Sequence, residues 1–295
     1  MEIILAQELG FCQGVRRALE MAEEAARAGQ QVRTLGDIVH NPQVVERLER
    51  QGVQVVAGLE SVGANEVAMV TAHGAPPEVA AQATARGIPL LDATCALVQR
   101  VQHLAQEMAE AGYAVVICGD PAHVEVRGIL GHAGAGGTAG RTLDEVRAYA
   151  AARGLPEPWD AQRRLAVLFQ TTQREDVYRS FVAELAQVAM ARLRELRVLN
   201  TVCVAVARRE PAARRLAQQV DVVLVVGGRT SANTRHLAES CAATGVPTYH
   251  VERADEVRAE WFAGAQRVGV TAGTSTPDET VAQVVAQVRA IAPAE

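Results

Sequence analysis

The chain has 295 residues, of which 49% are hydrophobic and 3% aromatic, and its formal charge is −5. This length allows two average or three small domains, and the acidic balance argues against non-specific nucleic-acid binding. No apolar run approaches the ~20 residues of a membrane span, and the short apolar start lacks the basic region and long core of a secretion signal. All 29 basic residues are arginines, which excludes Schiff-base and Walker-type lysine chemistry.

The five cysteines are Cys12, Cys95, Cys118, Cys203 and Cys241. An odd, sparse set without a secretion signal predicts reduced thiols and a cytoplasmic protein. None forms a C-x-x-C pair, so a zinc ribbon has no local support. Cys118 falls within a strand pattern and Cys241 within a helix pattern, and we expect both to be small buried hydrophobes.

The first third of the chain alternates between short apolar runs and amphipathic segments. Strands are expected at 3–6, 32–39, 53–56, 67–71 and 88–91, and helices at 15–25, 44–51 and a segment ending at Arg86. Cys12 lies between the first strand and the first helix. Free N–H groups at a helix start lower the pKa of a thiol, so this position favours a reactive or ligating cysteine.

The rest of the chain repeats this alternation twice, beginning at Cys95 and at Cys203. After Cys95 we expect a helix over 97–108, strands at 114–118 and 165–169, a glycine-rich loop at 134–140, and a helix reaching about Arg194. After Cys203 we expect helices to about Gln219, at 234–243 and at 280–291, and strands at 222–226, 248–251 and 268–271.

A constant spacing supports the repeat. The intervals from Cys12 to His40, from Cys95 to His123 and from Cys203 to Ser231 each span 28 positions. A later strand in each round ends in a polar loop, at His73, at Thr171-Thr172 and at Ser275. Alternating strands and helices predict parallel sheets, whose carboxyl ends collect functional groups.

We therefore predict an α/β protein of three small domains related by a pseudo-threefold axis, with parallel sheets around a central cavity. The expected divisions are 1–95 with the N-terminal strand, 96–199, 200–280, and a C-terminal helix and tail over 281–295.

Three equivalent thiols suggest a metal site. They would leave one position open on a tetrahedral zinc or on one iron of a 4Fe-4S cluster, and an open iron can bind substrate as a Lewis acid. Zinc with a fourth histidine ligand stays open, as does a set of buried hydrophobic cysteines. Donors at strand-end loops near helix starts suit a phosphate or diphosphate: His40, His73, Ser231, Asn233 and Ser275.

The segment His123-Val124-Glu125 is a candidate proton relay. Near a metal-bound oxygen, Glu125 could act as a general acid. The alternative is a surface glutamate that opens a helix, where its charge is favourable.

Short motifs in a fixed order along nearly the whole chain resemble the IspH/LytB family, the 4-hydroxy-3-methylbut-2-enyl diphosphate reductases of isoprenoid biosynthesis. They are Gly10-Phe11-Cys12-x-Gly14-Val15-x-Arg17-Ala18, Val39-His40-Asn41, Ala72-His73-Gly74, Asp92-Ala93-Thr94-Cys95, His123-x-Glu125-Val126, Gln170-Thr171-Thr172, Ser231-x-Asn233 and Ala272-Gly273-x-Ser275-x-Pro277-Asp278.

The resemblance implies three α/β domains around an iron–sulfur cluster, and reductive removal of the substrate's allylic hydroxyl to give isopentenyl and dimethylallyl diphosphate. It implies Cys12, Cys95 and Cys203 as ligands of one 4Fe-4S cluster, and Glu125 as proton donor with His123 and Thr171 orienting hydroxyl, water and phosphate. His40, His73, Ser231, Asn233 and Ser275 would bind the diphosphate. Reduced flavodoxin or ferredoxin would supply electrons, because no flavin or nicotinamide motif is evident.

The chain departs from the family pattern at four places. Ala96 and Val124 replace prolines, Ala232 replaces a second serine, and the Thr-rich run ending in Asn-Arg-Gln reads as the segment 206–210 here, Val-Ala-Arg-Arg-Glu. The first two changes remove backbone-stiffening residues, and the last two thin out hydroxyl donors in the third domain and add charge. A divergent iron–sulfur paralogue acting on another substrate is therefore an alternative, and a zinc-binding non-redox protein is a second.

Overall fold

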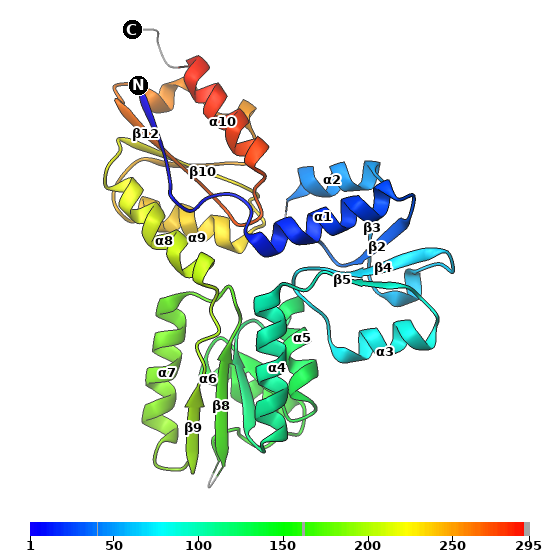
Figure 1. Cartoon of the computed structure of the whole chain (residues 1–295). Helices are drawn as coiled ribbons and strands as arrows, with labels where there is room; N and C mark the ends of the chain where they lie inside the picture. Colours follow the sequence, from blue (N-terminus) through cyan, green and yellow to red (C-terminus); the bar gives the residue numbers. More distant parts are fainter. Residues whose placement is uncertain (40, 161–162, 292–295) are drawn as a thin grey trace. The chain divides into compact units, whose positions relative to one another are not determined.

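The computed structural model describes residues 1–39, 41–160 and 163–291, which form two compact units (Figure 1). Unit 1 comprises Met1–Leu19, Asp37–Gln51 and the chain from Val204 onward, and unit 2 comprises Glu20–Gly36 and Gly52–Cys203. Helix α1 (Gln13–Arg27) begins in unit 1 and ends in unit 2. Within the described ranges, no helix has the length and apolar character needed to cross a membrane.

Unit 1 contains a parallel sheet in the order β1-β12-β10-β11. Its strands are β1 (Glu2–Leu5), β10 (Val222–Val226), β11 (Thr248–Val251) and β12 (Arg267–Ala272). Its helices are α2 (Pro42–Arg50), α8 (Val204–Ala217), α9 (Ala232–Ala242) and α10 (Asp278–Ile291), with short 3-10 helices at Ala254–Glu256 and Ala259–Phe262.

Alternate residues of β10 face opposite layers of helices. Val222, Leu224 and Val226 pack in a core with α10, whereas Val223 and Val225 pack with α8 and α9. A strand buried on both faces needs an unbroken apolar run, which is the pattern that β10 shows. Figure 1 shows α10 and the α8–α9 pair on either side of this sheet.

Unit 2 contains two sheets, and the first has the order β3-β2-β4-β5. Its strands are β2 (Gln31–Leu35), β3 (Val53–Val56), β4 (Glu66–Val70) and β5 (Leu90–Asp92), accompanied by α3 (Pro77–Ala85) and a 3-10 helix at Leu59–Ser61. Ala68 of β4 packs with Ala83 of α3 and with Leu59 and Ile88 in a small core. Proline at the start of α3 suits the first turn, where its missing N–H removes no helical bond.

The second sheet of unit 2 has the order β7-β6-β8-β9. Its strands are β6 (Ala114–Cys118), β7 (Thr138–Gly140), β8 (Arg164–Phe169) and β9 (Glu195–Val198), and its helices are α4 (Ala96–Glu110), α5 (Val124–Ala133), α6 (Leu143–Ala152) and α7 (Glu175–Ala189). Ile117 and Leu168 pack with α4 and α5, whereas Val116 and Val167 pack with α6 and α7. This sheet is therefore also covered on both faces.

The three sheets have one topology. In each, the strand that comes first in the repeat pairs with the second and third, and the fourth strand pairs with the third. The fourth place of the unit 1 sheet is taken by β1, from the opposite end of the chain, with Ile3 beside Val268. The predicted set of three α/β parts with parallel sheets is confirmed.

The pairing of β1 differs from the expected division of the chain. The N-terminal strand was expected within a first domain over 1–95, but it pairs with β12. The segment expected as a separate C-terminal helix, 281–295, begins within α10, which packs on the same sheet. Pairing between strands at opposite chain ends has no local signal, so the periodicity of neither strand reveals it.

Several elements between residues 119 and 198 were not expected: α5, β7, α6 and β9. The glycine-rich segment 134–140, expected as a loop, contains β7. A Cβ on Gly140 would lie 2.6 Å from the nitrogen of Val146, so the missing side chain lets α6 approach this strand. The edge strand β9 carries charged residues, which are typical of edges and hide a strand pattern.

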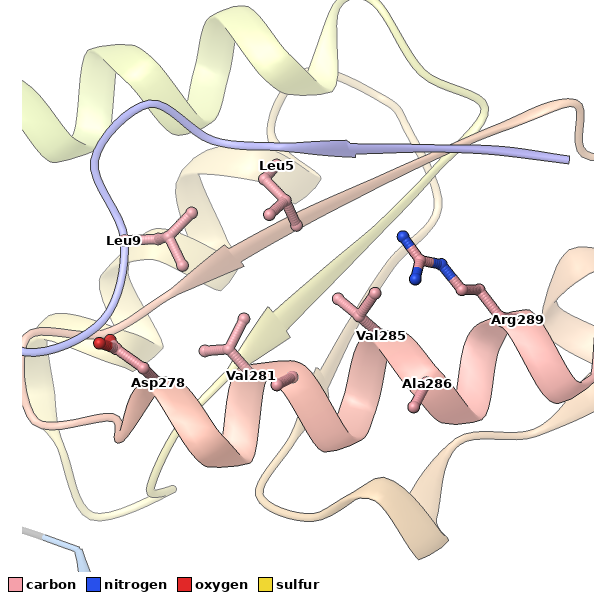
Figure 2. A pocket seen from close by; sticks show the side chains of 8 residues that line it. Leu5, Leu9, Asp278, Val281, Val285, Ala286 and Arg289 are labelled. Atoms are coloured by element: carbon pink, nitrogen blue, oxygen red, sulfur yellow. The ribbon is translucent and has the colours of Figure 1, made fainter.

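An open apolar hollow of about 370 Å³ lies along α10 in unit 1. Figure 2 shows Leu5 and Leu9, from β1 and the loop after it, beside the face of α10 that carries Val281 and Val285. Asp278 lies at one end of this hollow, where the chain leads toward Cys12.

Candidate active site

Each of Cys12, Cys95 and Cys203 immediately precedes a helix, respectively α1, α4 and α8. Each follows the fourth strand of its sheet, and its backbone N–H donates to a carbonyl beyond the end of the third strand. The bonds run from Cys12 to Thr274 at 3.3 Å, from Cys95 to Ala72 at 3.1 Å, and from Cys203 to Thr171 at 2.8 Å. The carbonyls of Cys12 and Cys95 accept the first helical bonds, from Arg16 and Gln99. The expected placement of a cysteine at a strand-to-helix turn is thus confirmed three times.

The five thiols fall into two classes. Cys12, Cys95 and Cys203 are partly exposed, whereas Cys118 and Cys241 are fully buried. Burial raises the pKa of Cys118 to about 12 and that of Cys241 to about 11. A thiol with a raised pKa is a poor ligand and nucleophile, so the expectation that these two are small core residues is confirmed.

The three partly exposed cysteines are divided between the units, with Cys12 in unit 1 and Cys95 and Cys203 in unit 2. In the described part of the chain, histidine, cysteine, aspartate and glutamate side chains form no group of three that could hold a metal ion. The ligand set predicted from the sequence therefore stays a prediction.

Glu125 lies in the first turn of α5 and is only 1% exposed. One carboxylate oxygen accepts the backbone N–H of Thr171 at 2.6 Å, and the other accepts the Thr171 hydroxyl at 3.0 Å. Burial raises the pKa of Glu125 to about 7, although both Thr171 bonds oppose the rise. A surface glutamate, the alternative left open by the sequence, is excluded. A carboxyl with this pKa can hold and release a proton near neutral pH.

His123 caps α5, with its Nδ1 accepting the backbone N–H of Glu125 at 3.1 Å. A neutral imidazole that accepts at Nδ1 carries its proton on Nε2, so the Nε2–H of His123 is a hydrogen-bond donor. The His73 ring lies edge-on to it, with centroids 5.6 Å apart, and the Nδ1 of His73 is 3.2 Å from the hydroxyl of Thr71. Two imidazoles and a buried acid thus gather at the carboxyl ends of the unit 2 strands.

In unit 1, Ser231 and Asn233 lie at the start of α9, and Ser275 follows β12. The Ser231 hydroxyl caps α9 by accepting the N–H of Thr234 at 3.4 Å. Among the described residues, neither the buried hydroxyl of Ser275 nor the buried amide nitrogen of Asn233 has a hydrogen-bond partner. Buried donors without partners cost free energy, so a ligand that accepts hydrogen bonds would be stabilised here.

Asn41 holds the Ser275 loop, because its amide donates to the Ser275 carbonyl at 3.4 Å. In the sequence, Asn41 stands within the Val39-His40-Asn41 motif, and nothing there predicts this contact. His40, predicted as a diphosphate ligand, lies outside the described residues.

A model of the LytB protein family matches residues 3–289. The chain belongs to this family.

Two of the proteins similar in sequence carry the same enzyme name. A protein of Geobacter sulfurreducens, named 4-hydroxy-3-methylbut-2-enyl diphosphate reductase, is 40% identical over 98% of this chain and 97% of its own. A protein of Aquifex aeolicus with the same name is 36% identical over 99% of this chain and 97% of its own.

Solved structures agree with the sequence relatives. One is of (E)-4-hydroxy-3-methyl-but-2-enyl diphosphate reductase, described as the terminal enzyme of the non-mevalonate pathway, with a TM-score of 0.75 and 35% identity over 98% of this chain and all of that one. Another is the Plasmodium falciparum E-1-hydroxy-2-methyl-but-2-enyl-4-diphosphate reductase, with a TM-score of 0.84 and 25% identity over 97% of this chain and 87% of that one. The expected resemblance to the LytB family is confirmed.

Two departures from the LytB pattern lie at helix starts. Ala96 and Val124 are the first residues of α4 and α5, where proline is favoured but not required. Both helices begin there without it, and the His123 cap supports the second.

The run 206–210 of α8 has a direct structural role, and within it Arg209 stands where the family pattern also has an arginine. In the run 206–210, Arg209 is buried and Glu210 accepts a hydrogen bond from the hydroxyl of Ser240 at 2.7 Å. Arg209 donates to two backbone carbonyls in unit 1. From the sequence, this segment shows fewer hydroxyl groups and more charge, but the burial of Arg209 was not expected.

Proposed function

We propose that this chain reduces 4-hydroxy-3-methylbut-2-enyl diphosphate to isopentenyl and dimethylallyl diphosphate in isoprenoid biosynthesis. The observation that carries the proposal is Glu125, a buried carboxyl with a pKa of about 7, bonded twice by Thr171, in a chain of the LytB family. Its relatives over the full length carry the name of this reductase.

The reaction consumes two electrons and two protons. The allylic carbon–oxygen bond breaks, a carbon–hydrogen bond forms, and the hydroxyl leaves as water. A protonated carboxyl near the departing hydroxyl is needed to make water the leaving group. Glu125 holds such a proton. The hydrogen bond that the Thr171 hydroxyl donates to a carboxyl oxygen of Glu125, at 3.0 Å, fixes the orientation of the carboxyl group.

We assign the electron-transfer group as one 4Fe-4S cluster held by Cys12, Cys95 and Cys203. The residues fit it, because all three thiols are partly exposed and each lies between the fourth strand of its sheet and the start of a helix. When bound, a cluster with three cysteine ligands supplies electrons and keeps one iron open for substrate oxygen.

The diphosphate ligands are proposed as His40, His73, Ser231, Asn233 and Ser275. The unpartnered donors of Asn233 and Ser275 and the α9 start support this assignment in unit 1. In unit 2, His73 lies beside His123, which presents its Nε2–H. We propose that the reaction needs these groups gathered in one cavity, with reduced flavodoxin or ferredoxin as electron donor, in the cytoplasm.

The test is anaerobic purification followed by turnover. The protein is expected to be brown, with about four irons and four sulfides per chain, and to form both products when dithionite-reduced methyl viologen supplies electrons. Colourless protein with one tightly bound zinc would refute the cluster. An intact cluster that yields neither product would favour a paralogue with another substrate. The absence of the family's second serine at Ala232 is a specific reason to consider this alternative.

Glu125→Gln separates the acid from the cluster. The variant is expected to keep its iron and lose most turnover, because an amide cannot deliver the proton. Exposed Glu107→Gln on α4 is the matched control and should match the unmodified protein. Full turnover by Glu125→Gln would remove Glu125 from the mechanism.

A further inference from the structure

The hydrogen bonding between the third and fourth strands continues past the strand ends toward each cysteine. In the first sheet of unit 2, Ala93 N–H donates to Val70 at 3.0 Å, two residues before the Cys95 bond. In the second sheet, the equivalent position is Thr201, whose hydroxyl donates to the Phe169 carbonyl at 2.6 Å. The same link is thus made once by a backbone amide and once by a side chain.

The unit 1 sheet makes this link in a third way. Ala6 N–H donates to Val270 and Cys12 N–H to Thr274. Between these two bonds the segment after β1 advances by six residues, whereas the segment at the end of β12 advances by only four. The turn before Cys12 therefore bulges by two residues, and a bulge leaves backbone groups unpaired. Arg209 spans it: its Nη1 donates to Gly10 O at 2.8 Å and to Ala272 O at 3.1 Å.

Comparison of the three helices that follow the cysteines sets Arg209 apart. The residue six positions after the cysteine is Ala18 in α1, Val101 in α4 and Arg209 in α8. All three are buried, at 0%, 0% and 2% exposure. Two are apolar, as expected for a core position. A buried guanidinium is costly unless its donors find acceptors, and the Nη1 of Arg209 donates to two carbonyls, Gly10 O in the bulged turn and Ala272 O at the end of β12.

We propose that Arg209 is a positioning residue that sets the Cys12 turn against the loop carrying Ser275. Ala272 lies two residues before Thr274, the acceptor of the Cys12 N–H, and three before Ser275. Arg209 thereby fixes a proposed cluster ligand and a proposed diphosphate ligand relative to each other. The consequence for catalysis rests on the proposed function, whereas the positioning of the turn does not.

The test is hydrogen exchange on the anaerobically purified full chain. Arg209→Met keeps the buried stem and removes the donors. The expected result is about tenfold less protection in peptides covering 7–12 and 273–276, which corresponds to about 1.4 kcal/mol, and unchanged protection in 93–95. The exposed neighbour Arg208→Met is the control and should leave every peptide unchanged.

Arg209→Lys keeps one donor group and is expected to restore part of the protection. Should Arg209→Met give no folded protein, Arg209→Gln, which keeps a donor but falls short of both carbonyls, takes its place with the same expected loss. Protection at 7–12 equal to that of the Arg208→Met control would overturn the proposal.

In the reconstituted enzyme, Arg209→Met is expected to change the electron paramagnetic resonance spectrum of the reduced cluster and to raise KM about tenfold, with Arg209→Lys intermediate. An unmodified chain that takes up no cluster would refute the proposed function but leave the exchange result standing. An unaltered spectrum and KM together with unaltered exchange would refute the positioning role alone.

Discussion

Glu125→Gln should make the stability of the cluster-free chain less dependent on pH. The pKa of Glu125 is about 7 in the folded protein against an ordinary value of 4.5. Because the folded state binds this proton more tightly, the carboxyl takes up a proton on folding between these pH values. Stability from this group is therefore intact below pH 4.5, falls as pH rises, and is fully lost above pH 7.

The magnitude follows from the size of the shift. Each pKa unit corresponds to 1.36 kcal/mol, so ionisation of buried Glu125 destabilises the folded chain by about 3 kcal/mol at alkaline pH. Gln keeps the shape of the side chain and carries no charge. Its oxygen can accept the N–H of Thr171, and its NH₂ can donate to the Thr171 hydroxyl.

The assay is urea denaturation at pH 5 and at pH 8, with Glu107→Gln as the control. Between pH 5 and pH 8, the free energy of unfolding of the unmodified chain should fall by roughly 2 to 3 kcal/mol more than that of Glu125→Gln. A shift below about 0.5 kcal/mol, within the range of ordinary surface substitutions, would refute the raised pKa.

Three further predictions use the same apparatus or simple kinetics. Thr171→Val removes a hydroxyl that lowers the pKa of the buried glutamate, so the alkaline limb of the pH–rate profile should move to higher pH; movement to lower pH would contradict this. Gly140→Ala should destabilise more than Gly136→Ala by ~1 kcal/mol in urea denaturation, because a Cβ at Gly140 would lie 2.6 Å from the backbone nitrogen of Val146, whereas nothing lies within 4 Å of one at Gly136; equal destabilisation would contradict this. Hydrogen bonds led by that of the Tyr113 hydroxyl lower the pKa of Glu195 to about 2, so the stability advantage over Glu195→Gln should be present above pH 4.5 and disappear as pH falls toward 2; an advantage independent of pH would refute it.

The fold was predictable where the signal was local and repeated. The 28-position interval corresponds to one helix and one strand leading from each cysteine to the loop after the first strand of a sheet, so counting residues found the repeat. The place of β1 was not predictable this way. Its partner, β12, is at the other end of the chain, and the pairing depends on the whole fold.

The candidate site was predictable in residue type but not in environment. Glu125 at a helix start reads from sequence as an exposed charge, and its burial and its bond to Thr171, 46 positions further along the chain, have no local signal. Arg209 follows another arginine in a polar stretch and gives no sign of burial. Aligning the three helices on their cysteines would have found it, because the equivalent positions are Ala18 and Val101.

Because β1 pairs with β12, the sheets form in a fixed order during synthesis of the chain. Unit 2 is complete once Cys203 has left the ribosome, but the sheet of unit 1 lacks β12 until Ala272 emerges. At ~5–20 residues per second, β1 waits roughly 13 to 55 s for its partner strand. The Cys12 turn is therefore the first of the three cysteine turns to be made and the last to gain its hydrogen-bond acceptor, Thr274. A nascent chain therefore holds an unfinished Cys12 turn until Thr274 has emerged, and we expect any group that Cys12 binds to be loaded only after that point.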